Sequence, residues 1–151
     1  MKKFKLTSEF IVDISGVKLF RIKALIEFGN VKAGDLGGYI EKEENLSHMG
    51  DAWVSDDARI SGNAQVFGDA QVFGDAWVSG DKDYAYAHGF GSCNRTTTFF
   101  RLKDGDVGVR CGCFYGTLAQ FRDKVCETHG ETKKAQEYLM LADLMEIRFK
   151  N

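Results

Sequence analysis

A six-residue repeat constrains the fold of this chain more than any other feature of its sequence. Five consecutive units run from Gly50 to Ser79. Each unit begins with Gly or Asp and then Asp or Asn, followed by Ala, a variable residue, Val or Ile, and a second variable residue. Because the Ala and the branched residue lie two positions apart, both side chains point to the same side of an extended strand. The Gly-Asp and Gly-Asn pairs favour turns. Each unit is therefore predicted to be a short strand followed by a turn, with the Ala and the Val or Ile inside.

The repeat is similar to the hexapeptide repeat of left-handed parallel β-helices, in which three units complete one triangular coil of about 18 residues. This similarity implies a mainly β fold built around a short left-handed parallel β-helix. A meander of short hairpins is the alternative interpretation of the same residues. Five units make about two regular coils, and an irregular unit at 36–40 suggests one ragged coil before them. A solenoid this short needs caps or partners over its ends.

The segments on both sides of the repeat are expected to supply these caps. Alternating apolar residues and a Ser-Gly turn near the N-terminus predict a β-hairpin. After the repeat, two strands joined by an Asp-Gly turn precede two helices, the first of which begins at Thr117 with a capping box. A last short strand is expected at 147–149. We therefore divide the chain into an N-terminal β cap (1–30), the repeat (31–83) and a C-terminal ββαα lobe (84–151).

Outward aromatic side chains on the repeat are candidate interface residues. On an 18-residue coil, Trp53 and Phe73 share one face, Trp77 lies on a second face beside Arg59, and Phe67 lies on the third. Exposed apolar patches often mark interfaces. Either another copy of the chain, in a dimer or trimer, or the flanking segments of the same chain would cover these rings.

Charge and composition narrow the class of protein. The formal net charge is −2, and residues 31–80 carry nine acidic side chains against three basic ones. This balance makes nucleic acid an unlikely partner, although a local basic patch stays compatible with it. The sequence has no apolar run long enough to cross a membrane and no secretory signal pattern. A cytoplasmic protein with free thiols and no cofactor is expected.

A polar stretch at 89–98 is the candidate anion-binding site. Its hydroxyl, amide and guanidinium groups are suited to hold a phosphate or a carboxylate. The alternative is an ordinary polar loop that leads into a hairpin. The candidate ligand-binding residues are Ser92, Asn94, Arg95, Thr96 and Thr97, with Arg101 and Arg110 on the neighbouring strands.

Acyl transfer and zinc binding are the two alternatives to a non-catalytic binding function. Hexapeptide-repeat acyltransferases use a loop histidine as general base at a trimer interface, and His88 is the candidate for that role here. The spacing of Cys111, Cys113, Cys126 and His129 permits a zinc site, which His88 and Cys93 could approach. Cysteine is, however, a common small buried side chain, and the paired C-x-x-C pattern is missing. We predict no catalytic residue and no metal.

The whole chain resembles small hexapeptide-repeat proteins of bacteriophages and mobile elements. The resemblance lies in the Gly-Asp-Leu-Gly-Gly-Tyr-Ile run at 34–40, in the repeat units, and in two stretches of the tail, Thr-Thr-Phe-Phe-Arg and Cys-Gly-Cys-Phe-Tyr-Gly-Thr. These proteins have no established activity to transfer. The resemblance implies a non-enzymatic counter-defence protein in the host cytoplasm, which blocks a bacterial defence protein or sequesters an anionic nucleotide-type signal. The blocking version would use the acidic turns, at Asp51, Asp57, Asp69 and Asp75. The sequestering version would use the arginine-threonine loop.

Overall fold

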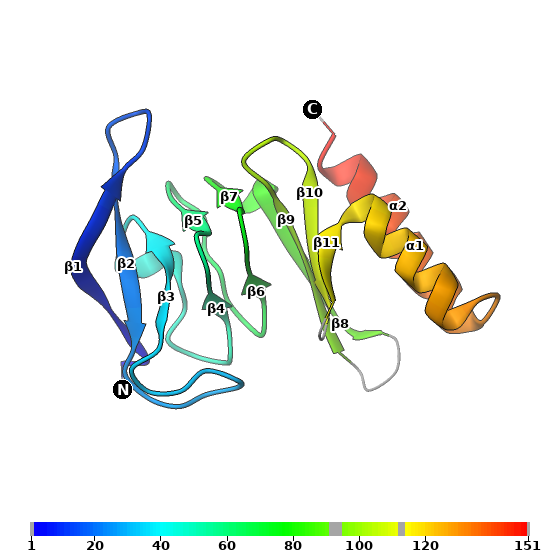
Figure 1. Ribbon diagram of the computed structural model, residues 1–151, viewed down its shortest axis with the longest axis horizontal. Helices are drawn as coiled ribbons and strands as arrows, with labels where there is room; N and C mark the ends of the chain where they lie inside the picture. The colour runs from blue at the N-terminus through cyan, green and yellow to red at the C-terminus, as the bar shows by residue number, and fades with distance from the viewer. Residues whose placement is uncertain (1, 91–94, 112–113, 151) are drawn as a thin grey trace.

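The computed structural model describes residues 2–90, 95–111 and 114–150. It is a mixed α/β structure with three small sheets and two helices among these residues. The elements follow one another along the long axis of the molecule, from the N-terminal hairpin through the repeat and a four-stranded sheet to the two helices (Figure 1).

The predicted left-handed parallel β-helix, and with it the mainly β fold class, is wrong. No sheet in the described part of the chain is closed or continues as a solenoid. Four of the five repeat units form strands, of only two residues each. These strands are β4 (Trp53–Val54), β5 (Arg59–Ile60), β6 (Gln71–Val72) and β7 (Trp77–Val78). Because five short units supply so few ladder hydrogen bonds, most of the sheet structure comes from the flanking segments.

The local prediction of a short strand is confirmed for four of the five repeat units, whereas in the unit at 62–67 Val66 forms only an isolated bridge to Leu46. Units 18 positions apart pair in parallel, with Trp53 opposite Gln71 and Arg59 opposite Trp77. The Ala and Val or Ile side chains are all at most 1% exposed and form the centre of one hydrophobic core. These residues are Ala52, Val54, Ala58, Ile60, Ala64, Val66, Ala70, Val72, Ala76 and Val78.

The predicted N-terminal hairpin is confirmed. Strands β1 (Phe4–Val12) and β2 (Lys18–Ala24) pair antiparallel, and β3 (Leu36–Ile40) follows on the other side of β2. Strands β5 and β7 of the repeat then join β3 in parallel, which gives a five-stranded sheet in the order β1-β2-β3-β5-β7. The hairpin is therefore part of the same sheet as the repeat.

The tail forms an antiparallel sheet covered by two helices. Its strands are β8 (Tyr84–Phe90), β9 (Arg95–Arg101), β10 (Val107–Cys111) and β11 (Phe114–Thr117), in the order β11-β10-β9-β8. The helices are α1 (Leu118–His129) and α2 (Lys133–Arg148). The capping box of Thr117 with Gln120 is confirmed. The strand predicted at 147–149 is wrong, because α2 continues to Arg148.

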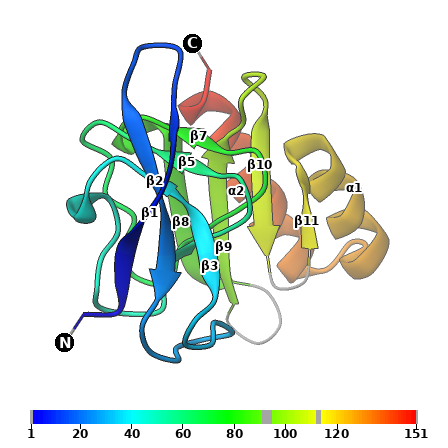
Figure 2. The same cartoon turned by 60° about the vertical axis from the view of Figure 1, so that its left-hand side comes forward.

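The tail sheet lies between two hydrophobic cores (Figures 1 and 2). Phe100 on β9 is fully buried in the core of the repeat, whereas its neighbour Phe99 is fully buried in the core beneath α1 and α2. Alternate side chains of one strand therefore join the repeat to the helices.

A buried lysine ties the N-terminus to the repeat. Lys3 is 1% exposed, and its Nζ donates hydrogen bonds to the carbonyl oxygens of Ala52 at 2.7 Å and Gly50 at 3.3 Å. The ammonium group also lies 4.6 Å from the centre of the Phe28 ring. Burial lowers the pKa of Lys3 from 10.5 to about 8, although the nearby carboxylates of Asp51 and Asp69 act in the opposite direction.

This lowered pKa predicts a pH-dependent stability. Between pH 8 and 10.5 the unfolded chain holds the Lys3 proton more tightly than the folded one, so stability rises as the pH increases. From pH 7.5 to 9.5 we expect a gain on the order of 1 kcal/mol in the free energy of unfolding. Urea denaturation should show this gain in the wild type and in Lys5→Met, an exposed control two residues further along the chain, but not in Lys3→Met. An equal gain in Lys3→Met would contradict the assignment.

Candidate ligand-binding groove

A groove of about 670 Å³ opens where three parts of the chain meet. The tip of the β1–β2 hairpin forms one wall, one face of the repeat forms the second, and the tail forms the third. All three segments lie along the upper edge of the molecule in Figure 1. The side chains that line the groove include Asp13, Ile14, Arg59, Trp77, Lys82, Asp83, Arg101, Lys103, Arg148 and Lys150.

Positive charge predominates in this groove. Its described lining contains six basic residues and two acidic ones, although the whole chain has a net charge of −2. Both carboxylates are engaged in their own turns. Asp13 Oδ1 accepts from the backbone N–H groups of Ser15 and Val17, and Asp83 Oδ2 accepts from both the N–H and the hydroxyl of Ser79. The groove is therefore suited to an anion.

The pair of Asp83 and Arg101 forms a rigid part of this lining. Arg101 Nε donates to Asp83 Oδ1 at 3.0 Å, and Arg101 Nη2 donates to the carbonyl of Phe149 at 3.2 Å. Burial alone would raise the pKa of Asp83, but the hydrogen bonds from Ser79 and Arg101 hold it below its ordinary value. The carboxylate therefore stays ionised. Together, Asp83 and Arg101 connect β9, the turn after the repeat and the end of α2.

Trp77 gives the groove an aromatic surface. It lies on β7, an edge strand of the five-stranded sheet, and its side chain is 42% exposed. The Arg59 guanidinium, from the paired strand β5, lies 4.9 Å from the centre of the ring. Such a cation–aromatic pair holds both groups at the surface of the groove.

Much of the predicted anion loop lies outside the described residues. Ser92 and Asn94 lie outside the described residues, and of Arg95 only the backbone, in β9, is described. The hydroxyl of Thr96 lies 2.7 Å from His88 Nδ1. Thr97 is fully buried, and its hydroxyl donates to the Cys111 sulfur at 3.3 Å. The two described threonine hydroxyls are therefore engaged inside the tail.

The two predicted arginines lie apart, on opposite faces of the tail sheet. Arg101 lines the groove, on the face that carries α2. Arg110 lies on the face toward the repeat, where its Nε donates to Gln71 Oε1 at 3.3 Å and its guanidinium lies 4.7 Å from the centre of the Phe73 ring. It lines a separate cavity of about 130 Å³. Of the predicted ligand-binding residues with described side chains, Arg101 alone reaches the groove.

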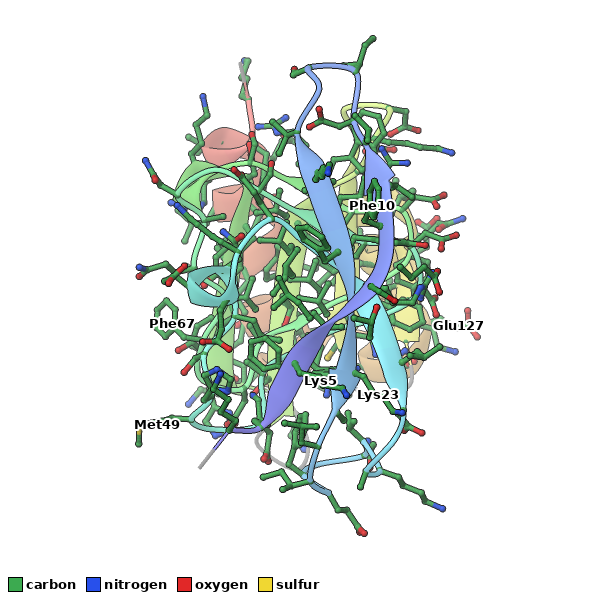
Figure 3. All side chains as sticks on the ribbon, turned by 90° about the vertical axis from the view of Figure 1, so that its left-hand side faces the viewer. Lys5, Phe10, Lys23, Met49, Phe67 and Glu127 are labelled. Atoms are coloured by element: carbon green, nitrogen blue, oxygen red, sulfur yellow. The ribbon has the colours of Figure 1, made fainter. Side chains whose placement is uncertain are left out.

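The four predicted interface aromatics fall into two classes. Trp53 is 7% exposed and packs edge-on against Phe28, and Phe73 packs against Tyr115, so other parts of the same chain cover this face. Phe67 and Trp77 remain 50% and 42% exposed. Figure 3 shows Phe67 at the surface of the repeat.

The alternative catalytic and metal residues do not line the groove. His88 is exposed on β8, beside Thr96. Cys111 is buried with its sulfur 3.7 Å from the Tyr138 hydroxyl, and Cys126 is exposed. Cys93 and Cys113 lie outside the described residues. Within the described ranges, no group of three or more His, Cys, Asp or Glu side chains is arranged to hold a metal ion. None of the described helices is long and apolar enough to span a membrane.

Sequence analysis missed most of the basic groove residues. Lys82, Lys103, Arg148 and Lys150 come from three separate stretches of the chain, and no local motif joins them. One signal was available, since the 18-residue spacing places Arg59 and Trp77 side by side. No protein-family model matches this chain, and no curated protein sequence matches it either. The geometry of the groove is therefore the observation on which a function can be based.

Proposed function

We propose that this chain is a binding protein whose groove holds a small molecule with several negative charges, of the phosphate-bearing class. The observation that carries this proposal is the convergence of six basic side chains from the repeat and the tail on one groove. Its volume, about 670 Å³, is in the range of pockets that enclose small ligands.

Three lysines supply charge that the protein itself does not neutralise. Among the described side chains, Lys82, Lys103 and Lys150 take part in no ion pair. A lysine ammonium is a mobile point charge that binds phosphate oxygens well. Arg101 is different, because Asp83 already neutralises it. The lysines would therefore provide attraction, and the Asp83–Arg101 pair would provide a fixed wall.

Binding without turnover is the version of this function that the groove supports. Both carboxylates of the groove accept hydrogen bonds within the protein, Asp13 in the hairpin turn and Asp83 from Ser79 and Arg101. Sequestration of an anionic nucleotide-type signal would use such a site. A counter-defence role stays a prediction that comes from the resemblance to phage proteins.

Hydrogen exchange with inorganic triphosphate as the probe tests this proposal. Because one ligand would contact all three walls, we expect slower amide exchange in the hairpin tip at 13–17, the turn at 79–83, the β9–β10 turn at 102–106 and the end of α2. Helix α1, of which no residue lines the groove, serves as the internal control, and its amide exchange should be unchanged. Protection confined to the acidic turns of the repeat, or no protection at all, would contradict the proposal.

A further inference from the structure

We infer that the ligand of this groove carries a planar aromatic ring that stacks on Trp77, which makes it a nucleotide rather than a bare polyphosphate. This inference rests on the proposed function and names the ligand class of the same site. It starts from the only large aromatic side chain in the described lining of the groove.

The Trp77 ring is held in place but left open. Its neighbours Ala76 and Val78 are both buried in the repeat core, and the backbone N–H of Ser79 donates to Asp83. The strand on both sides of the ring is therefore fixed. Even so, 42% of the side chain is exposed, which is unfavourable for so large an apolar surface unless something covers it.

The Arg110–Phe73 pair of the repeat differs from the Arg59–Trp77 pair in how the aromatic ring is covered. Phe73 has the Arg110 guanidinium on its ring, and Tyr115 closes its other side at a ring distance of 4.7 Å. Trp77 has the guanidinium of Arg59 on its ring, but no aromatic contact within the described residues closes it. Both sites thus have a guanidinium on an aromatic ring, but among the described residues only the Phe73 ring has a second aromatic ring against it.

The opposite wall of the groove adds apolar surface. Ile14, at the tip of the hairpin, is fully exposed and lines the same groove as Trp77. The groove therefore combines two exposed apolar side chains, Ile14 and Trp77, with basic residues. A nucleotide combines a planar base with phosphate charges in the same way, and stacking of a base on an aromatic side chain strengthens binding by about tenfold or more.

Fluorescence of Trp77 tests the inference. The chain contains two tryptophans, so Trp53→Phe leaves Trp77 as the only indole and keeps an aromatic ring beside Phe28. We expect at least one of ATP, GTP, CTP and UTP to quench this fluorescence and to bind about tenfold more tightly than inorganic triphosphate. In the otherwise wild-type chain, calorimetry should show that Trp77→Leu removes the preference for the nucleotide over triphosphate.

Phe67→Leu is the matched control, because Phe67 is an equally exposed aromatic residue of the repeat outside the groove. It should keep the preference. If triphosphate binds but all four nucleotides bind no more tightly in the wild type, or if Trp77→Leu keeps the preference, the inference is overturned while the proposed function stands. If neither triphosphate nor any nucleotide binds, the proposed function fails together with the inference.

Discussion

Replacing Asp83 by alanine should destabilise the protein by about 3 kcal/mol, one of the two largest effects expected here. The Asp83 side chain is 6% exposed and that of Arg101 is 19% exposed, so the change leaves a largely buried guanidinium without its counter-charge. It also removes the acceptor for the Ser79 N–H and hydroxyl. Urea denaturation of the variant should therefore show a clearly lower midpoint.

Asp143→Ala is the matched control for this prediction. Asp143 also pairs with an arginine, Arg122, at 2.8 Å, but its side chain is 73% exposed. An exposed ion pair contributes about 1 kcal/mol or less, so this variant should remain close to the wild type. Equal losses in the two variants would show that the Asp83–Arg101 pair has no special structural role.

Acid titration provides a second test of the same pair. The pKa of Asp83 in the folded protein lies below the ordinary value of 3.8, so the stability it contributes is present above that pH. This contribution is lost as the pH falls through the folded pKa. The difference in stability between the wild type and Asp83→Asn should therefore be constant near neutral pH and shrink below pH 3.8. A difference that grows in acid would contradict the assigned direction.

The repeat shows which part of the fold could be predicted from the sequence. Alternation of Ala and Val or Ile determines which side chains are buried, because it depends only on the period of a strand. The way the strands combine into sheets depends on pairing between distant segments. Strand β5 pairs with β3, which belongs to the hairpin sheet, and this sheet was not predictable from the hexads alone.

The tail helices were predictable because their signals are local. Thr117 and Gln120 mark the beginning of α1, and Thr132 accepts a hydrogen bond at the beginning of α2. The end of α2 was predicted too early, because a strand was expected at 147–149. Met145 and Phe149 are both buried against the tail core, and this tertiary packing favours continuation of the helix to Arg148.

A shift of one residue in a turn explains why two of the predicted ligand-binding residues, Arg101 and Arg110, lie apart. A two-residue Asp-Gly turn at 104–105 would place Arg101 and Arg110 on the same face of the sheet. The observed register pairs Arg101 with Val107 and Arg110 with Thr98, which is one residue away from that arrangement. Because neighbouring residues of a strand face opposite sides, this shift puts the two arginines on opposite faces.

The second large effect is expected for the three groove lysines. Changing Lys82, Lys103 and Lys150 together to glutamine removes three positive charges from the groove without adding a carboxylate. If each charge contributes about 0.5 to 1 kcal/mol, affinity for triphosphate should fall at least tenfold. Binding by the wild type should also weaken as salt is added, because these lysines are close to solvent.

Isothermal titration of this triple variant with inorganic triphosphate tests the central claim most directly. Lys5, Lys23 and Lys124 lie outside the groove, so changing these three to glutamine removes the same charge from elsewhere on the molecule. Figure 3 shows Lys5 and Lys23 on the β1–β2 hairpin. The account predicts that the groove variant loses at least tenfold in affinity and that the control variant stays within about twofold of the wild type. Equal losses in the two variants, or a wild type that does not bind triphosphate, would contradict it.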